Sequence, residues 1–174
     1  QILDKGTTHL SNAEVLNWTR RTRERYKRED EADKATGRPF KARPQGIIRS
    51  LNKTERELAD RKYPYTRNPS VYAADGDAVG ALAQLDAEVT EAVVAPLSQR
   101  ALERDASAPG KVEWLEERMA EKGLTRTELL MVLNHAPTEV QILKNMIEDC
   151  ERRFEDEELQ RIVEVCVKVL RRDE

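Results

Sequence analysis

Cysteine, histidine and glycine are scarce in this chain of 174 residues, and aromatic residues make up 5%. The two cysteines, Cys150 and Cys166, form no Cys-x-x-Cys pair, which excludes a zinc ribbon or disulfide scaffold and indicates reduced thiols. The two histidines, His9 and His135, stand far apart and outside any metal-ligand spacing. The seven glycines include no phosphate-binding loop. We therefore expect no metal, cofactor, small-molecule substrate or catalytic residue.

Long hydrophobic runs are also missing. A bilayer span needs roughly 18 or more consecutive apolar residues, and the apolar stretches here are only a few residues long. The sequence therefore predicts no membrane segment. No charged region followed by an apolar one opens the chain, so we expect no signal peptide, and because it begins at Gln1 we expect a piece of a longer protein.

Charge is abundant and unevenly distributed. Charged residues make up 36% of the chain and the net charge is -3. Residues 18–49 hold eleven basic and five acidic residues with few apolar ones, whereas residues 138–174 hold eleven acidic and seven basic residues. Large apolar residues are concentrated between Val112 and Leu170, where we expect the core. A basic arm and an acidic folded body favour different partners for the two parts.

The chain is predicted to be helical almost throughout. Proline and glycine mark linkers at residues 36–46, 63–80 and 105–110. Four segments carry the Ser/Thr-x-x-Glu/Gln pattern of a capping box, at Ser11, Thr54, Thr125 and Thr138. The predicted helices span residues 12–26, 54–62, 78–95, 111–122, 125–133, 138–151 and 156–170. No segment has the alternation of a strand, although residues 1–10 are expected to form a short extended arm.

Apolar stripes at three- and four-residue spacing support the last predicted helices. The helix from Thr138 has such a stripe, and the final helix repeats it with Leu159, Ile162, Val163, Cys166 and Leu170. The carboxylates of Glu155 to Glu158 stand at the beginning of the final helix. Their negative charge stabilises a helix there, because the N-terminal end of the helix dipole is positive. We expect a helix start there rather than a cation site.

The basic segment 20–49 could contact nucleic acid, because Lys and Arg near phosphates release counterions. Its aromatic residues are Tyr26 and Phe40, with Trp18 just before it. The expected contacts are Arg20, Arg21, Arg23 and Arg25. The alternative is a solvated helix face followed by a flexible linker, since acidic residues are interspersed.

Two separated motifs resemble a known family. One is the run Leu129 to Pro137, with Glu139 to Ile142 and Glu148 to Phe154 after it, and the other is Leu10-Ser11-Asn12-x-Glu14-Val15. Both resemble the small stalk subunit of eukaryotic RNA polymerase III, which is related to the small stalk subunits of polymerase II and archaea. Ala13 stands where that family has an aromatic residue. The resemblance covers about the first 17 residues and 111–170, and the insertion 73–108 lies outside it.

The resemblance implies an all-α, HRDC-like helical bundle with a short extended N-terminal arm and a long charged connection. Its parts would be an arm and helix start at 1–17, folded back on the bundle; a basic helix, linkers and Ala-rich insertion at 18–110; and an HRDC-like domain at 111–174. It also implies a nuclear, non-catalytic subunit. The implied partners are the larger stalk subunit, the polymerase III core, a Brf-type initiation factor for tRNA and other small-RNA genes, and emerging RNA.

For the partner interface we select residues in the two motifs. They are Leu3, Leu10, Val15, Leu16, Asn134 and Pro137. The alternative for all six is ordinary packing or turn chemistry within the chain.

Two other functions remain open. One is a free-standing HRDC-like nucleic-acid-binding module that uses the basic segment 20–49. The other is an accessory component of a peptide-hormone receptor, because animal relatives of the family are also called calcitonin gene-related peptide receptor component. No membrane span or lipidation motif in the sequence supports that membrane role.

Overall fold

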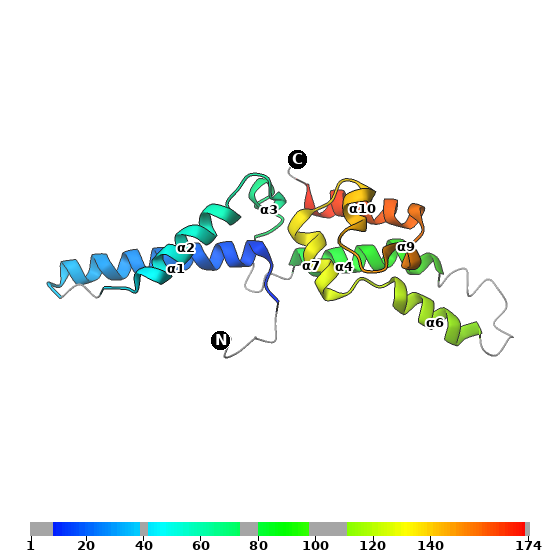
Figure 1. Cartoon of the computed structure of the whole chain (residues 1–174), viewed down its shortest axis with the longest axis horizontal. Helices are drawn as coiled ribbons and strands as arrows, with labels where there is room; N and C mark the ends of the chain where they lie inside the picture. The colour runs from blue at the N-terminus through cyan, green and yellow to red at the C-terminus, as the bar shows by residue number, and fades with distance from the viewer. Residues whose placement is uncertain (1–8, 39–41, 74–79, 98–110, 173–174) are drawn as a thin grey trace.

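The computed structural model describes residues 9–38, 42–73, 80–97 and 111–172, with the backbone alone for 111–116. All its regular elements within these ranges are helices, which confirms the all-α prediction. The molecule is elongated: a two-helix hairpin extends to one side and a helical bundle forms the other (Figure 1). None of the described helices has the length and apolar character that crossing a membrane requires.

The hairpin consists of α1 (Asn12–Ala35) and α2 (Gln45–Leu58). The predicted capping box begins α1: the Ser11 hydroxyl accepts from the Glu14 amide at 3.3 Å, and the Glu14 carboxylate accepts from the Ser11 amide. The helix runs nine residues beyond the predicted end at Tyr26 and stops before Gly37, whose φ is +65°. Exposed i,i+4 ion pairs and contact with α2 support this extension.

The predicted start of the second helix is wrong. α2 begins at Gln45, after Pro44, so Thr54 lies inside the helix rather than at its N-cap. Pro44 provides a fixed φ that suits a helix start. Glu57, the expected partner in the capping box, instead pairs with Lys53 one turn earlier at 3.9 Å.

An aromatic joint connects the hairpin to the bundle. It is built around α3 (Pro64–Arg67), a short helix in the predicted 63–80 linker. The rings of Tyr63 and Tyr65 stack with centroids 5.2 Å apart, and Tyr72 meets Tyr65 edge-on at 6.0 Å. Tyr65 packs with Ala13 and Leu16 of α1 in a small cluster separate from the main core.

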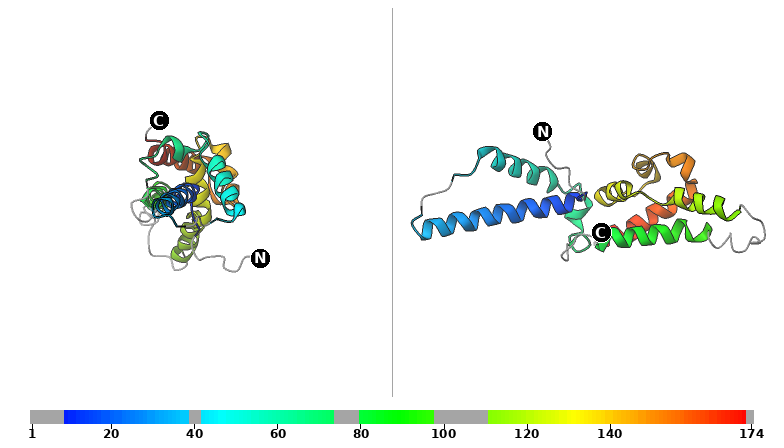
Figure 2. Two further views of the ribbon diagram at one scale, coloured as in Figure 1. Left: turned by 90° about the vertical axis from the view of Figure 1, so that its left-hand side faces the viewer. Right: turned by 90° about the horizontal axis from the view of Figure 1, so that it is seen from below.

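The bundle contains the remaining helices around one apolar core. Their bounds are α4 (Gly80–Val93), α6 (Lys111–Lys122), α7 (Arg126–His135), α8 (Val140–Lys144), α9 (Cys150–Arg153) and α10 (Asp156–Leu170). α10 packs beside α4 (Figure 2). Its predicted stripe of Leu159, Ile162, Val163, Cys166 and Leu170 is fully or almost fully buried. The predicted starts of α7 and α10 are close to those observed, and α7 begins with the predicted Thr125 capping box.

The Ala-rich helix α4 belongs to the core, although its sequence placed it in the connection. It makes the most extensive helix pairing in the bundle, with α10. Leu82, Leu85, Val89 and Val93 recur at three- and four-residue spacing, and all four are buried. Burial of each such side chain stabilises the fold by about 1.5–3 kcal/mol.

The single helix predicted at residues 138–151 is broken into α8 and α9. The capping box at Thr138 is not formed, because α8 begins after Glu139 without a side-chain cap. The Glu148 amide donates to the Glu128 carboxylate at 2.9 Å instead of continuing a helix. Asp149 then adopts a left-handed conformation with φ of 48°, and α9 starts at the next residue.

Candidate partner interface

The turn after α7 holds two of the selected positions. α7 ends at His135, and Ala136 takes a left-handed conformation with φ of 41°, while its amide donates to the Val132 carbonyl at 2.7 Å. Pro137 is fully buried, so it cannot meet a partner without rearrangement. It cannot continue the helix because it lacks an amide donor. The turn therefore packs into the bundle, while Asn134 next to it is half-buried.

Asn134 connects this turn to the start of α1. Its side-chain oxygen accepts from the Asn12 amide at 2.9 Å. The first amides of a helix have no partner within the helix, so Asn134 satisfies one of them. Nearby, the Tyr72 hydroxyl donates to the Leu133 carbonyl at 2.7 Å. The two motifs, far apart in sequence, are thus in direct contact at the joint.

The selected N-terminal residues divide into exposed and buried positions. Leu10 is 56% exposed, Val15 is half-buried, and Leu16 is only 4% exposed. Leu16 packs with Ala13 in the joint cluster. Leu3 lies outside the described residues. Among the selected positions that the structure describes, Leu10 is therefore the one best placed to meet another protein.

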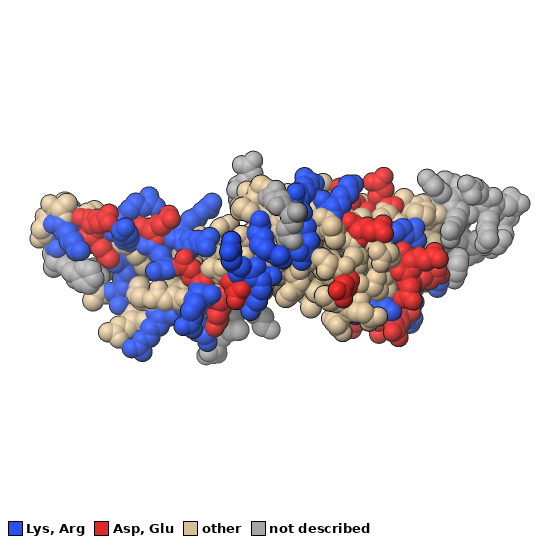
Figure 3. Space-filling view, turned by 90° about the horizontal axis from the view of Figure 1, so that it is seen from above, with Lys and Arg blue, Asp and Glu red and all other residues tan. Residues whose placement is uncertain are grey.

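The four selected arginines also divide into two sets. Arg20 and Arg23 face α2, where both pair with Glu55. Arg21 and Arg25 lie on the outer face of α1 with Trp18. In the space-filling view, basic side chains predominate over the hairpin and acidic ones gather over the bundle (Figure 3). The sequence placed these arginines together, but the helix periodicity separates them.

Arg43 lies in the loop that precedes α2 and attaches this loop to α1, a role that sequence reasoning missed. Its guanidinium pairs with Asp30 and with Glu29, the latter at 2.7 Å. It also donates to the Tyr26 carbonyl at 3.2 Å and lies 4.2 Å from the centroid of the Tyr26 ring. Hydrogen bonds to Asp30 and Glu29 raise the pKa of Arg43. The acidic pair Glu29-Asp30 is the sequence signal for a basic partner here.

A buried polar network joins the end of α6, the start of α7 and α9. Glu128 accepts from the Thr125 and Glu148 amides and pairs with Arg153 at 2.5 Å. Arg153 also donates to the carbonyls of Glu121, Gly123 and Glu148. Burial alone raises the pKa of Glu128, but its hydrogen bonds with Arg153 and the amides outweigh this effect and lower the pKa. Arg153 therefore closes the loop between α8 and α9.

A second buried ion pair joins α6 to α10. Lys122 contacts both carboxylate oxygens of Glu158, and the two side chains are 4% and 7% exposed. Glu158 also accepts from the Glu155 amide at 2.9 Å at the start of α10, where the carboxylate run was expected to begin a helix. Within the described ranges, no group of three or more His, Cys, Asp or Glu residues could hold a metal ion.

Comparison with known protein families identifies a match that covers most of the chain. A family model described as RNA polymerase Rpb4 matches residues 9–170. This range includes α1, the insertion with α4, and α10. No curated protein and no solved structure matches the chain.

Proposed function

This chain belongs to the RNA polymerase Rpb4 family, and we propose that it is the small stalk subunit of RNA polymerase III. The family consists of non-catalytic subunits of the polymerase stalk, which partner the larger stalk subunit and the polymerase core. The polymerase III assignment is supported by the resemblance of the two motifs, one at Leu10 to Val15 and one at Leu129 to Phe154, to that subunit. The hydrogen bond between Asn12 and Asn134 brings these motifs together in one structural unit, which supports the stalk function.

In this role the protein forms a heterodimer with the larger stalk subunit in the nucleus. It supports initiation on tRNA and other small-RNA genes through a Brf-type initiation factor, and the stalk meets emerging RNA. Leu3, Leu10 and Val15 are the residues that we propose for contact with the larger subunit, and of these Leu10 and Val15 are described in the structure. Leu10 is the described member that is most exposed, and an exposed leucine gains stability when a partner covers it.

The polymerase assignment is tested by affinity purification of the tagged protein from nuclear extract, with high-salt washes and mass spectrometry. The expected result is stoichiometric recovery of the larger stalk subunit and the two largest subunits of polymerase III. Recovery of the largest polymerase II subunits instead would contradict the polymerase III assignment. A protein that elutes alone would contradict the stalk function altogether.

The interface is tested with Leu10→Asp in the same purification. A charge at this position should lower recovery of the larger stalk subunit at least tenfold. Val167→Asp is the matched control, because Val167 is also exposed, at 42%, but lies on α10 in the bundle. Unchanged recovery with Leu10→Asp would contradict the proposed contact. Leu16→Asp is unsuitable, because burial of the new carboxylate would disturb the joint itself.

The alternative, a free-standing nucleic-acid-binding module, has weaker support. It needs a continuous basic surface, but Arg20 and Arg23 are paired with Glu55. Salt distinguishes the two functions, because binding to several phosphates falls steeply with salt. An apolar subunit interface at Leu10 persists under the same conditions.

A further inference from the structure

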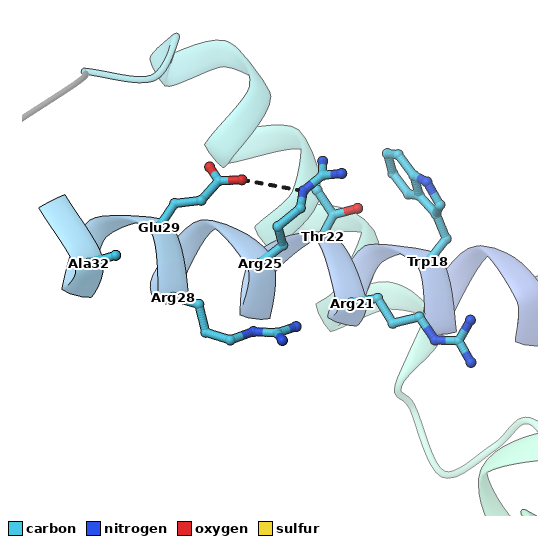
Figure 4. Close-up of a pocket in the computed structure, with 7 residues that line it drawn as sticks. All are labelled: Trp18, Arg21, Thr22, Arg25, Arg28, Glu29 and Ala32. Carbon is cyan, nitrogen blue, oxygen red and sulfur yellow. Dashed lines mark ion pairs between the residues drawn. The ribbon is translucent and has the colours of Figure 1, made fainter.

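The outer face of α1 carries an aromatic and basic stripe that the stalk assignment does not explain. Trp18, Arg21, Arg25, Arg28 and Ala32 recur at alternating spacings of three and four residues. This spacing places them along one side of a helix, at the positions that face a partner helix in a coiled coil. They line an open groove of about 780 Å³ together with Thr22 and Glu29 (Figure 4). We call these five residues the outer stripe.

The outer stripe faces solvent rather than the rest of the described chain. Trp18 is 59% exposed, which is unusual for so large an aromatic side chain. Arg21 and Arg28 are exposed and form no ion pair with any described residue. Arg25 is 60% exposed and reaches Glu29 at 3.8 Å, a surface pair that contributes little stability. Tryptophan and arginine are both enriched among the residues that contribute most binding energy near the centres of protein interfaces.

The shape of the groove favours an elongated occupant. A single helix lines it, so it does not enclose a ligand as a small-molecule pocket does. From Trp18 to Ala32 the stripe is about 21 Å long, at about 1.5 Å for each residue of a helix. A second helix of four turns covers that length. The 3-4 spacing of the stripe is the pattern that packs against another helix.

The charges of the groove indicate which residues the partner helix should carry. Three arginines on one line attract carboxylates at matching positions. Glu29, in the wall of the groove, is already paired with Arg43 at 2.7 Å and with Arg25 at 3.8 Å, so it needs no partner from outside the hairpin. A protein helix can place its acidic side chains opposite Arg21, Arg25 and Arg28 at the same heptad spacing. It can also place apolar side chains over Trp18 and Ala32.

We propose that the outer stripe of α1 is a docking surface for an acidic amphipathic helix of another protein. The arginines select acidic residues on the partner, and Trp18 anchors its apolar side. This surface lies on a different side of α1 from Arg20 and Arg23, which bind α2 through Glu55. The docking therefore leaves the hairpin intact.

The test uses the full chain and a synthetic helical peptide of three heptads, with leucine and glutamate at the positions facing the stripe. A peptide with glutamine for each glutamate and a single-stranded oligouridylate are the comparison probes. Binding is followed by fluorescence anisotropy and by the blue shift of tryptophan emission. Trp18→Phe identifies the part of that signal that Trp18 provides, since the chain has a second tryptophan, Trp114.

We expect the acidic peptide to bind at least tenfold more tightly than the glutamine peptide and the oligouridylate. Arg25→Glu should weaken binding of the acidic peptide at least tenfold and favour a peptide with lysine for glutamate. Lys27→Glu is the matched control. Nine residues, about two and a half turns, separate Lys27 from Trp18, so it lies on the opposite side of α1.

Three results would overturn the proposal. The acidic peptide shows no binding, the oligouridylate binds more tightly than the acidic peptide, or Lys27→Glu weakens binding as much as Arg25→Glu. Far-UV circular dichroism establishes that each variant is folded, which is expected because all the substituted side chains are exposed. The test needs no polymerase, so its failure leaves the stalk assignment unaffected.

Discussion

The backbone amide of Asn12 and the side-chain oxygen of Asn134 are joined by a hydrogen bond of 2.9 Å, across 122 residues of sequence. This bond attaches the start of the hairpin to the end of α7. Because a helix start cannot satisfy its own first amides, Asn134 completes α1 as well as holding it in place. Assembly of the joint and formation of the first turn of α1 are thus coupled.

Asn134→Ala should destabilise the protein by about 1 kcal/mol, because it leaves the Asn12 amide without its acceptor. Urea unfolding measures the loss, and hydrogen exchange should become faster at the first turn of α1. Asn145→Ala is the matched control, since the Asn145 amide group bonds only locally, to the Gln141 carbonyl at an exposed site. Equal effects of the two substitutions would contradict a special role for Asn134.

Arg153→Ala should be far more damaging than its neighbour Arg152→Ala. Arg153 is 11% exposed and neutralises Glu128, whereas Arg152 is 72% exposed and pairs loosely with Asp149 at 3.8 Å. Loss of one partner of a buried ion pair costs about 3–5 kcal/mol, whereas an exposed pair contributes about 0–1 kcal/mol. Urea midpoints of the two variants measure the difference, and similar midpoints would show that the network is dispensable.

The stability of the bundle should depend on pH through Glu128. Because the pKa of Glu128 is lowered in the folded protein, its stabilising effect is fully present above the pKa of an unfolded glutamate, about 4.3. That effect is lost as the pH falls through the lower folded value. Glu128→Gln should therefore show a weaker loss of stability below about pH 4 than the unsubstituted protein. Parallel curves of unfolding free energy against pH would be inconsistent with this role.

Leu85→Ala tests whether α4 belongs to the core. Leu85 is fully buried, so truncation should cost about 2–5 kcal/mol through lost burial and the cavity left behind. Glu91→Ala, at an exposed position on the same helix, should change stability by less than about 0.5 kcal/mol. Thermal or urea unfolding compares the two, and a negligible effect of Leu85→Ala would place α4 outside the cooperative unit.

Features that depend on neighbouring residues were predictable from the sequence. The capping boxes at Ser11 and Thr125, the start of α10 within its run of carboxylates, and the apolar stripe of α10 all follow local patterns. The break between α8 and α9 was not predictable, because the Glu148 amide bonds to a carboxylate twenty residues away. The spacing of apolar residues within one segment cannot reveal a hydrogen-bond acceptor that lies in another segment.

In the candidate site, too, the features that distant parts of the chain determine could not be predicted from the sequence. Leu10 and Leu16 look alike in the sequence, yet only Leu10 is exposed, because Leu16 packs in a joint formed by tyrosines some fifty residues further along the chain. The four arginines likewise form one run, and α2 determines which of them remain outward. Pairing of Arg20 and Arg23 with Glu55 depends on the return of α2 along α1.

The aromatic joint has a mechanical consequence. α1 extends from it as a single helix of 24 residues, about 36 Å long at about 1.5 Å per residue. Such a rod acts as a lever: a tilt of roughly 10° where Tyr65 packs against Ala13 and Leu16 moves its far end by roughly 6 Å, as its length dictates. Small adjustments in the packing of a few tyrosine rings thus set where the remote tip of the hairpin lies.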